Sequence, residues 1–143
     1  MKKKLILIGI AVLFFAVFFS MALIPYTVLE YDMDIKVGTD KTIGINVGTD
    51  AIHFGKVPSE KITGRSTEAV RELSVSSGDT DVKVTVKTAG EMGQWVTADP
   101  KEFNLAKNQT KVIVLTAVVP YDTEPGVYNG TVIVTLLKDY GFF

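Results

Sequence analysis

The chain has 143 residues, a formal net charge of −1 and no cysteine. This length suits one domain once a targeting segment is set aside, and the lack of cysteine excludes disulfides, thiol catalysis, thiolate metal sites and a lipidated cysteine. Without Lys2, Lys3 and Lys4, the 15 basic residues fall to 12 against 16 acidic ones, a net charge of −4. A mildly acidic chain without a basic face is not expected to bind nucleic acid.

The N-terminal segment has the pattern of a membrane anchor. Three lysines precede Leu5–Ile24, which is twenty residues long and carries no charge. As a helix rising about 1.5 Å per residue, such a segment spans the hydrocarbon core of a bilayer. The lysines favour a cytoplasmic N-terminus. We therefore expect residues 1–25 to be a transmembrane anchor and residues 26–143 to form a domain outside the cytoplasm, at the cell membrane.

The same segment also has the pattern of a signal peptide. Ser20, Met21 and Ala22 form a small-x-small triplet that permits cleavage after Ala22, and the domain would then be secreted. An apolar run without a helix breaker before Pro25 favours retention as an anchor. In both cases the rest of the chain leaves the cytoplasm.

The first predicted strand lies in residues 27–37, where apolar residues alternate with charged ones: Leu29, Tyr31, Met33, Ile35 and Val37. Alternation of this kind indicates a strand with one face in a core and one in water. Two Val-Gly-Thr-Asp units follow, Val37–Asp40 and Val47–Asp50, on either side of a short predicted strand at Ile43–Val47. Their ten-residue spacing is typical of strands and turns, so we interpret the repeat as a feature of the fold and not as two ligand loops.

The remaining chain is also rich in alternating segments and contains no amphipathic helix of useful length. The polar stretch Pro58–Gly64 is predicted to be a connection, and a slip of phase within Ser66–Ser76 predicts a β-bulge. Further strands are predicted at Ile52–Val57, Ser66–Ser76, Val82–Lys87, Trp95, Phe103 to Leu105, Thr110–Pro120 and Gly130–Leu137. The sequence therefore predicts an all-β fold, an immunoglobulin-like Greek-key β-sandwich of 7–9 strands preceded by one N-terminal hydrophobic helix.

The order of short phrases resembles one class of surface module. The phrases are "IHFGKV", "ELSV", "VKVTV", "WVTADP", "FNLAKNQT", "TAVVP" and "PGVYNGTVIV", which together cover residues 50–138. This order is similar to that of the Hydin-type, BACON-type and major-sperm-protein-like sandwiches of bacterial and archaeal surface proteins. The family usually has Asn-x-Gly where "VSSGD" stands here, and residues 25–48 precede its usual start. A weaker similarity links "INVGTDAIHFGKV" to biofilm-matrix subunits of the TasA and camelysin kind.

Five residues are expected to have structural roles, namely Phe54, Trp95, Pro125, Gly126 and Tyr128. Pro125 and Gly126 are expected to form a tight turn, with proline fixing its φ and glycine taking a positive φ. The ring of Tyr128 is expected to pack under the last strand while its hydroxyl reaches the backbone. Trp95 is expected to be the largest core residue.

The sequence offers few groups for catalysis or metal binding. His53 is the only histidine, no Gly-x-Ser-x-Gly phrase accompanies it, and we expect it to face solvent. Glu30, Asp32 and Asp34 share one side of the first strand, but carboxylates about 7 Å apart hold calcium only if loops fold over them. We therefore expect a solvated acidic face, no metal site, no cofactor and no enzymatic activity.

Asn108 and Asn129 each begin an acceptor triplet for N-glycosylation, which agrees with export. Loop tips at residues 59–64, 77–81, 89–94 and 121–126 are candidate contact surfaces, and none of them is rich in aromatic residues, which argues against carbohydrate binding.

The expected function is therefore non-catalytic: a membrane-anchored domain outside the cytoplasm that makes protein–protein or structural contacts in the cell envelope. Its expected partners are the membrane, through Leu5–Ile24, and other envelope proteins or further copies, through a strand edge. The alternative is a secreted subunit of an extracellular filament or matrix that assembles by β-strand donation, because Leu29–Val47 precedes the common module. A hydrolase would have to depend on His53.

Overall fold

The computed structural model describes residues 8–13, 27–39, 43 and 51–139. These residues form a predominantly β fold with one short helix, α2 (Glu60–Thr63), and helical residues at 8–13. The strands of the described part are β1 (Thr27–Gly38), β2 (Ile52–Pro58), β3 (Glu68–Ser76), β4 (Val82–Ala89), β5 (Val96–Asp99), β6 (Glu102–Leu105), β7 (Thr110–Val118) and β8 (Gly126–Lys138).

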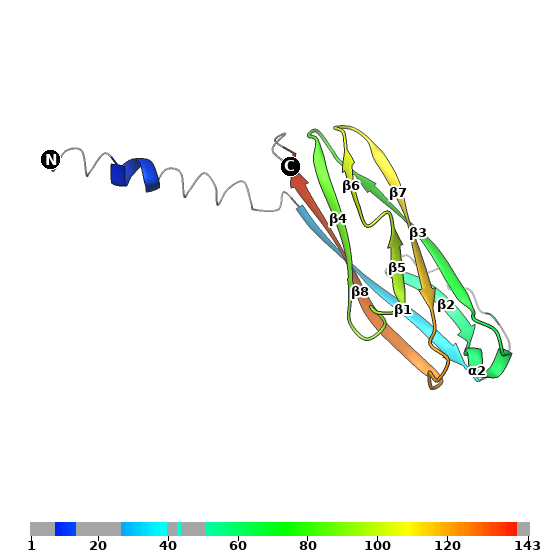
Figure 1. The fold of residues 1–143 in the computed structure, drawn as a ribbon. Coiled ribbons are helices and arrows are strands. Elements are labelled where there is room, and N and C mark those ends of the chain that lie inside the picture. Colours follow the sequence, from blue (N-terminus) through cyan, green and yellow to red (C-terminus); the bar gives the residue numbers. More distant parts are fainter. Residues whose placement is uncertain (1–7, 14–26, 40–42, 44–50, 140–143) are drawn as a thin grey trace.

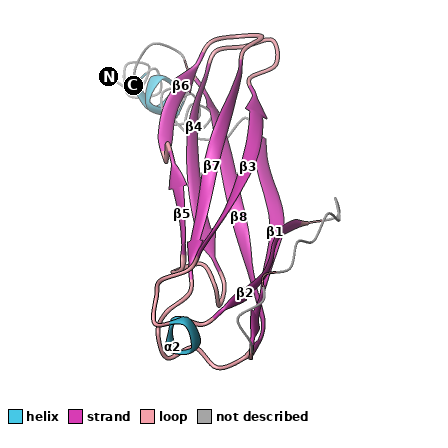
Figure 2. Ribbon diagram, turned by 90° about the vertical axis from the view of Figure 1, so that its right-hand side faces the viewer, coloured by secondary structure: helices cyan, strands magenta, loops and turns pink. Residues whose placement is uncertain are grey.

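The strands form two layers that face one another (Figures 1 and 2). One sheet has five strands in the order β2-β1-β8-β4-β6, and the other has three in the order β3-β7-β5. Neighbouring strands are antiparallel except β1 and β2, which run parallel. The prediction of an all-β, two-sheet fold is confirmed.

The expected N-terminal anchor, Leu5–Ile24, lies largely outside the described residues. Only residues 8–13 of this segment are described. Within the described part of the chain, no helix has the length and apolar character needed to cross a membrane.

The core lies between the two sheets and follows the period-two pattern of the sequence. Its largest fully buried side chains come from β1, β7, β8 and other elements, among them Met33, Ile35, Ile113, Leu115, Val132 and Val134, each no more than 1% exposed. Burying an aliphatic side chain of this size stabilises a fold by about 1.5–3 kcal/mol. The alternating strands therefore supply the main driving force for the two-layer arrangement.

Strand β1 lies inside the five-stranded sheet and not at its margin. It pairs with β8 along its whole length, from Thr27 opposite Leu136 to Val37 opposite Gly126. On its other side β2 pairs with it only from Met33 onward, where Met33 lies opposite Ile52. The predicted first strand thus pairs within its own chain.

The predicted bulge in Ser66–Ser76 is wrong. The ladder between β3 and β7 runs without a shift from Glu68 opposite Val118 to Ser76 opposite Thr110. The apparent slip of phase arises because Ala69 takes the core position while Val70 points outward and is 47% exposed.

The irregularity lies instead in β2. Asp34 is opposite His53, but Lys36 is opposite Lys56, so β2 has one residue more than β1 between these pairs. Gly55 has φ +83°, which residues with a side chain rarely adopt. This extra residue allows Phe54 and Val57, three positions apart, both to face the core at 3% exposure.

Two further predictions need correction, and a third lies largely outside the described residues. The last strand begins at Gly126, before the predicted Gly130, and the connection Pro58–Gly64 contains one helical turn, α2. Of the predicted strand Ile43–Val47, only Ile43 is described; it is 71% exposed and not in a strand, and the rest lies outside the described residues.

Candidate functional site

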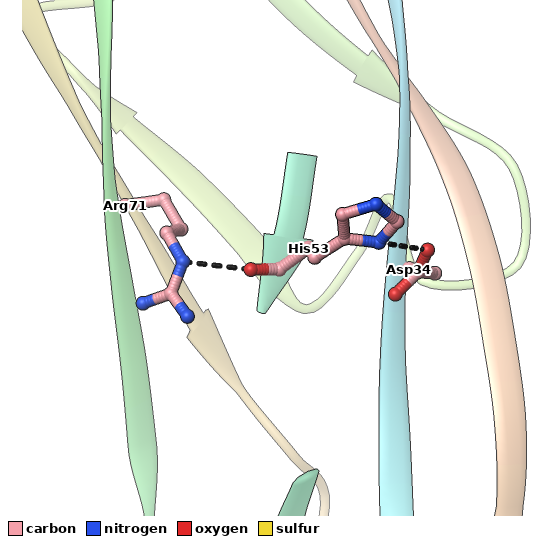
Figure 3. Close-up of polar contacts among 3 residues, drawn as sticks. All are labelled: Asp34, His53 and Arg71. Atoms are coloured by element: carbon pink, nitrogen blue, oxygen red, sulfur yellow. Dashed lines mark hydrogen bonds and ion pairs between the residues drawn. The ribbon is translucent and has the colours of Figure 1, made fainter. Parts of the chain in front are cut away.

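Three polar side chains meet where β1, β2 and β3 come together at one edge of the sandwich (Figure 3). The Nδ1 atom of His53 lies 2.6 Å from Oδ2 of Asp34. Arg71 donates from Nε to the backbone carbonyl of His53 at 2.7 Å and from Nη1 to the carbonyl of Val70 at 2.7 Å. We call Asp34, His53 and Arg71 the edge cluster.

The strand pairing explains how these residues meet. The parallel register of β1 and β2 sets Asp34 directly opposite His53, and their side chains share the outer face of the sheet. Arg71 occupies a core-facing position of β3, in phase with Ala69 and Val75. Because β3 is the outermost strand of its sheet, the guanidinium reaches past the core to the other sheet.

The edge cluster corrects the predicted solvent exposure of His53. The His53 side chain is only 9% exposed and that of Asp34 is 29% exposed. Glu30 and Asp32 remain exposed on the same face of β1, as expected. The three acids predicted to form one solvated row are therefore divided, because β2 covers only the part of β1 that contains Asp34.

The edge cluster links β2 to both β1 and β3. The carboxylate of Asp34 contacts one ring nitrogen of His53, and the guanidinium donates to one backbone carbonyl from each sheet, those of His53 and Val70. A buried or half-buried carbonyl without a partner destabilises a fold, and an open edge invites pairing with another chain. The contacts of the edge cluster therefore join three strands and cover part of two edges.

We expect Asp34→Ala to lower the free energy of unfolding by about 1 kcal/mol, because His53 loses a charged acceptor that is itself partly screened by water. Asp32→Ala is the matched control, since Asp32 is exposed two residues away on the same face. The measurement is the urea midpoint of both variants. Equal midpoints would mean that the contact between Asp34 and His53 contributes nothing to stability.

Two of the predicted structural residues, Trp95 and Tyr128, lie together at the end of the sandwich where β8 begins. Their ring centroids are 4.7 Å apart and their planes are tilted by 56°. The Tyr128 hydroxyl donates to the carbonyl of Glu124 at 2.6 Å, the backbone contact expected from the sequence. Trp95 is only partly buried, however, and packs against the core from its margin.

The remaining predicted residues are more dispersed. Phe54 is buried on β2. Gly126 does not take a positive φ, contrary to the prediction, because it already pairs with Val37 as the first residue of β8. Pro125 is exposed just before it.

The two asparagines of the acceptor triplets are both exposed but differ in setting. Asn108 lies in the turn between β6 and β7 with φ +58°. Asn129 lies within β8, opposite Asp34. The structure thus places one acceptor on a turn and the other on a paired strand.

An open hollow of about 450 Å³ lies on the other side of the sandwich, between β4 and β5. Val86, Val96 and Ala98 form its buried apolar floor, and Lys87 and Lys101 lie at its margin. Glu102, also at the margin, pairs with Lys83 at 2.7 Å. Across the described residues, no three His, Cys, Asp or Glu side chains are placed to hold a metal ion.

Sequence reasoning did not find the edge cluster. Its only signals were a single histidine and the last of three alternating acids, 19 residues apart. Arg71 stood in a predicted strand with no hint of a partner. The parallel pairing that joins these residues is a tertiary feature.

The chain matches no protein-family model, no curated protein and no solved structure.

Proposed function

We propose that this protein is a non-catalytic β-sandwich of immunoglobulin-like, Greek-key type that is anchored in the cell membrane and makes protein contacts outside the cytoplasm. One observation carries the proposal: twenty uncharged residues, Leu5–Ile24, follow three lysines and are followed almost at once by β1 at Thr27. The contact between Tyr128 and Glu124 supports the immunoglobulin-like classification, since a tyrosine bonded to nearby backbone recurs at one corner of such folds.

The strand register gives this proposal an orientation. Thr27 pairs with Leu136 near the end of β8, and Val82 at the start of β4 pairs with Lys138. An anchor that precedes Thr27 holds this end of the sandwich toward the membrane. The opposite end, with α2 and the loops after β4 and β7, then faces away and is available to partners (Figure 1).

The lack of cysteine provides a direct test of topology. Tyr121 is 54% exposed in the loop after β7, so Tyr121→Cys introduces a single accessible thiol at the far end. We expect a membrane-impermeant maleimide to label this variant on intact cells. Lys3→Cys, on the cytoplasmic side, is the matched control and should be labelled only after lysis.

Labelling of Tyr121→Cys only after lysis would contradict the proposal. The N-terminal sequence of the mature protein separates it from the alternative, because a chain that begins before Leu5 retains the whole apolar segment. A mature chain that begins at Leu23 would instead favour the secreted filament subunit.

A further inference from the structure

Among the described residues, β2 covers only half the length of β1 on the side of the sandwich that carries the edge cluster. Strand β2 pairs with β1 from Met33 to Gly38. Over Thr27–Asp32, the described residues that pair with β1 are those of β8 alone. Among the described residues, the N–H and C=O groups of this half of β1 that point away from β8 therefore have no strand partner, along an edge about 20 Å long.

The burial of β1 changes at the residue where β2 begins. Met33, Ile35 and Val37, which lie beside β2, are at most 1% exposed. Leu29 and Tyr31 point into the same core face but are only partly buried. The alternation of the strand is unbroken, so the difference follows the point where pairing with the described residues of β2 begins and not a change of side-chain direction.

Strand β3 and the edge cluster lie beside this half of β1. Across from the open half of β1, the three-stranded sheet ends at β3, whose Leu73 is also only partly buried against the core. The edge cluster lies at one end of this half of β1. His53 belongs to the second residue pair of the ladder between β2 and β1, and Arg71 of β3 donates to its backbone carbonyl. We call the edge of β1 over Thr27–Asp32, together with the partly buried Leu29, Tyr31 and Leu73, the strand slot; it continues the line of β2.

The outer face beside the strand slot is acidic. Glu30 and Asp32 are exposed and point to this face, and neither takes part in an ion pair among the described residues. In a paired strand, the residues directly opposite these acids would lie on the same face, within about 5.5 Å between Cβ atoms. Opposite charges at such positions stabilise pairing and like charges oppose it.

We propose that the strand slot binds an extended segment of a partner protein in which apolar and basic residues alternate. The segment adds a strand to β1 in line with β2, with apolar side chains on the core face and Lys or Arg opposite Glu30 and Asp32. Backbone pairing of this kind provides affinity, and the alternate side chains provide specificity. The inference names a partner chemistry for the protein contacts proposed above and so rests on that function.

A second copy of this chain is a poor occupant. If two β1 edges paired antiparallel about Tyr31, Glu30 of each copy would lie opposite Asp32 of the other. Two acid–acid pairs would then oppose the contact. The same charge pattern that attracts a basic segment therefore discourages self-association through this edge.

The test uses the full chain, labelled with ¹⁵N, in micelles of an uncharged maltoside detergent. The probe is a capped heptapeptide in which valine and lysine alternate. One control peptide replaces lysine with glutamate, and another has proline at its centre. We expect the lysine peptide alone to shift the amide resonances of Thr27–Asp32 and to slow hydrogen exchange along this edge.

A charge reversal sharpens the test. In the double variant Glu30→Lys, Asp32→Lys, the affinity for the lysine peptide should fall about tenfold or more, because two attractive pairs become repulsive. The same variant should now bind the glutamate peptide. Glu91→Lys, Asp122→Lys is the matched control, with exposed acids at the opposite end of the sandwich, and should bind like the parent chain.

Several results would overturn the proposal: no binding of the lysine peptide, resonance shifts confined to the hollow between β4 and β5, or a proline-containing peptide that binds equally well. A concentration-dependent dimer whose shifts map to Thr27–Asp32 would also overturn it, in favour of a second copy. None of these results depends on the cellular location of the domain, and the maleimide test does not depend on the peptide.

Discussion

A chain shortened to begin at Thr42 should not fold, whereas one that begins at Tyr26 should unfold cooperatively. The shorter chain lacks β1, which lies between β2 and β8 in the five-stranded sheet. It loses the fully buried Met33, Ile35 and Val37, each of which contributes about 1.5–3 kcal/mol. Together they contribute a large share of the free energy of unfolding of a typical domain, which is about 5–15 kcal/mol. The loss also removes the strand with which β2 pairs among the described residues.

The measurement is a thermal melt followed by circular dichroism, together with the fraction of protein that remains soluble. A point variant tests the same contact in a chain of full length. Ile35→Ala should lower the free energy of unfolding by about 2–5 kcal/mol, while its exposed neighbour Lys36→Ala should change it little. A shortened chain that melts at the same temperature as the longer one would show that β1 is not part of the cooperative fold.

Gly130→Ala should destabilise the fold by about 1–3 kcal/mol, because Gly130 lies where three other segments approach β8 closely. A Cβ atom at this position would lie 2.6 Å from Cε of Met33, 2.8 Å from the carbonyl oxygen of Ala89 and 2.9 Å from Cγ of Met92. The methionine side chains can move, but the Ala89 carbonyl belongs to the backbone and cannot leave without disturbing the end of β4.

Gly126→Ala is the matched control for Gly130→Ala. Both glycines lie in β8, but the nearest atom to a Cβ at Gly126 is Cε2 of Tyr128, at 3.9 Å, which is an ordinary contact. Chemical denaturation of both variants measures the difference, and a 1 kcal/mol loss lowers the melting temperature by about 4–8 °C in a small domain. If both variants unfold at the same denaturant concentration, the close approach of Met92 and Ala89 to Gly130 is not a constraint on this fold.

Much of the fold was predictable because it depends on local alternation. The pattern of Leu29 to Val37 identified a half-buried strand, and Val82 to Lys87 identified another. Each such strand buries one face, so a chain without an amphipathic helix has to pack sheet against sheet. The prediction of the Tyr128 hydroxyl contact was also local, since its acceptor lies only four residues away.

The errors arose where a residue's surroundings come from distant strands. The sequence of Ser66–Ser76 contains two apolar neighbours, Ala69 and Val70, and nothing local shows which of them faces the core. The position of the bulge in β2 depends on how Gly55 meets β1, and the exposure of His53 depends on Asp34 across that pairing.

The amino-acid sequence by itself therefore determined the uncharged N-terminal segment, the all-β character and most strand positions, because each follows from composition or from a period of two residues. Only the tertiary structure decided that β2 runs parallel to β1 and covers half of it. That choice depends on contacts between β1, β2 and β3, which are separated in the sequence by the connections at 39–51 and 59–67. It brings Asp34, His53 and Arg71 together, and among the described residues it leaves Thr27–Asp32 of β1 paired with β8 alone.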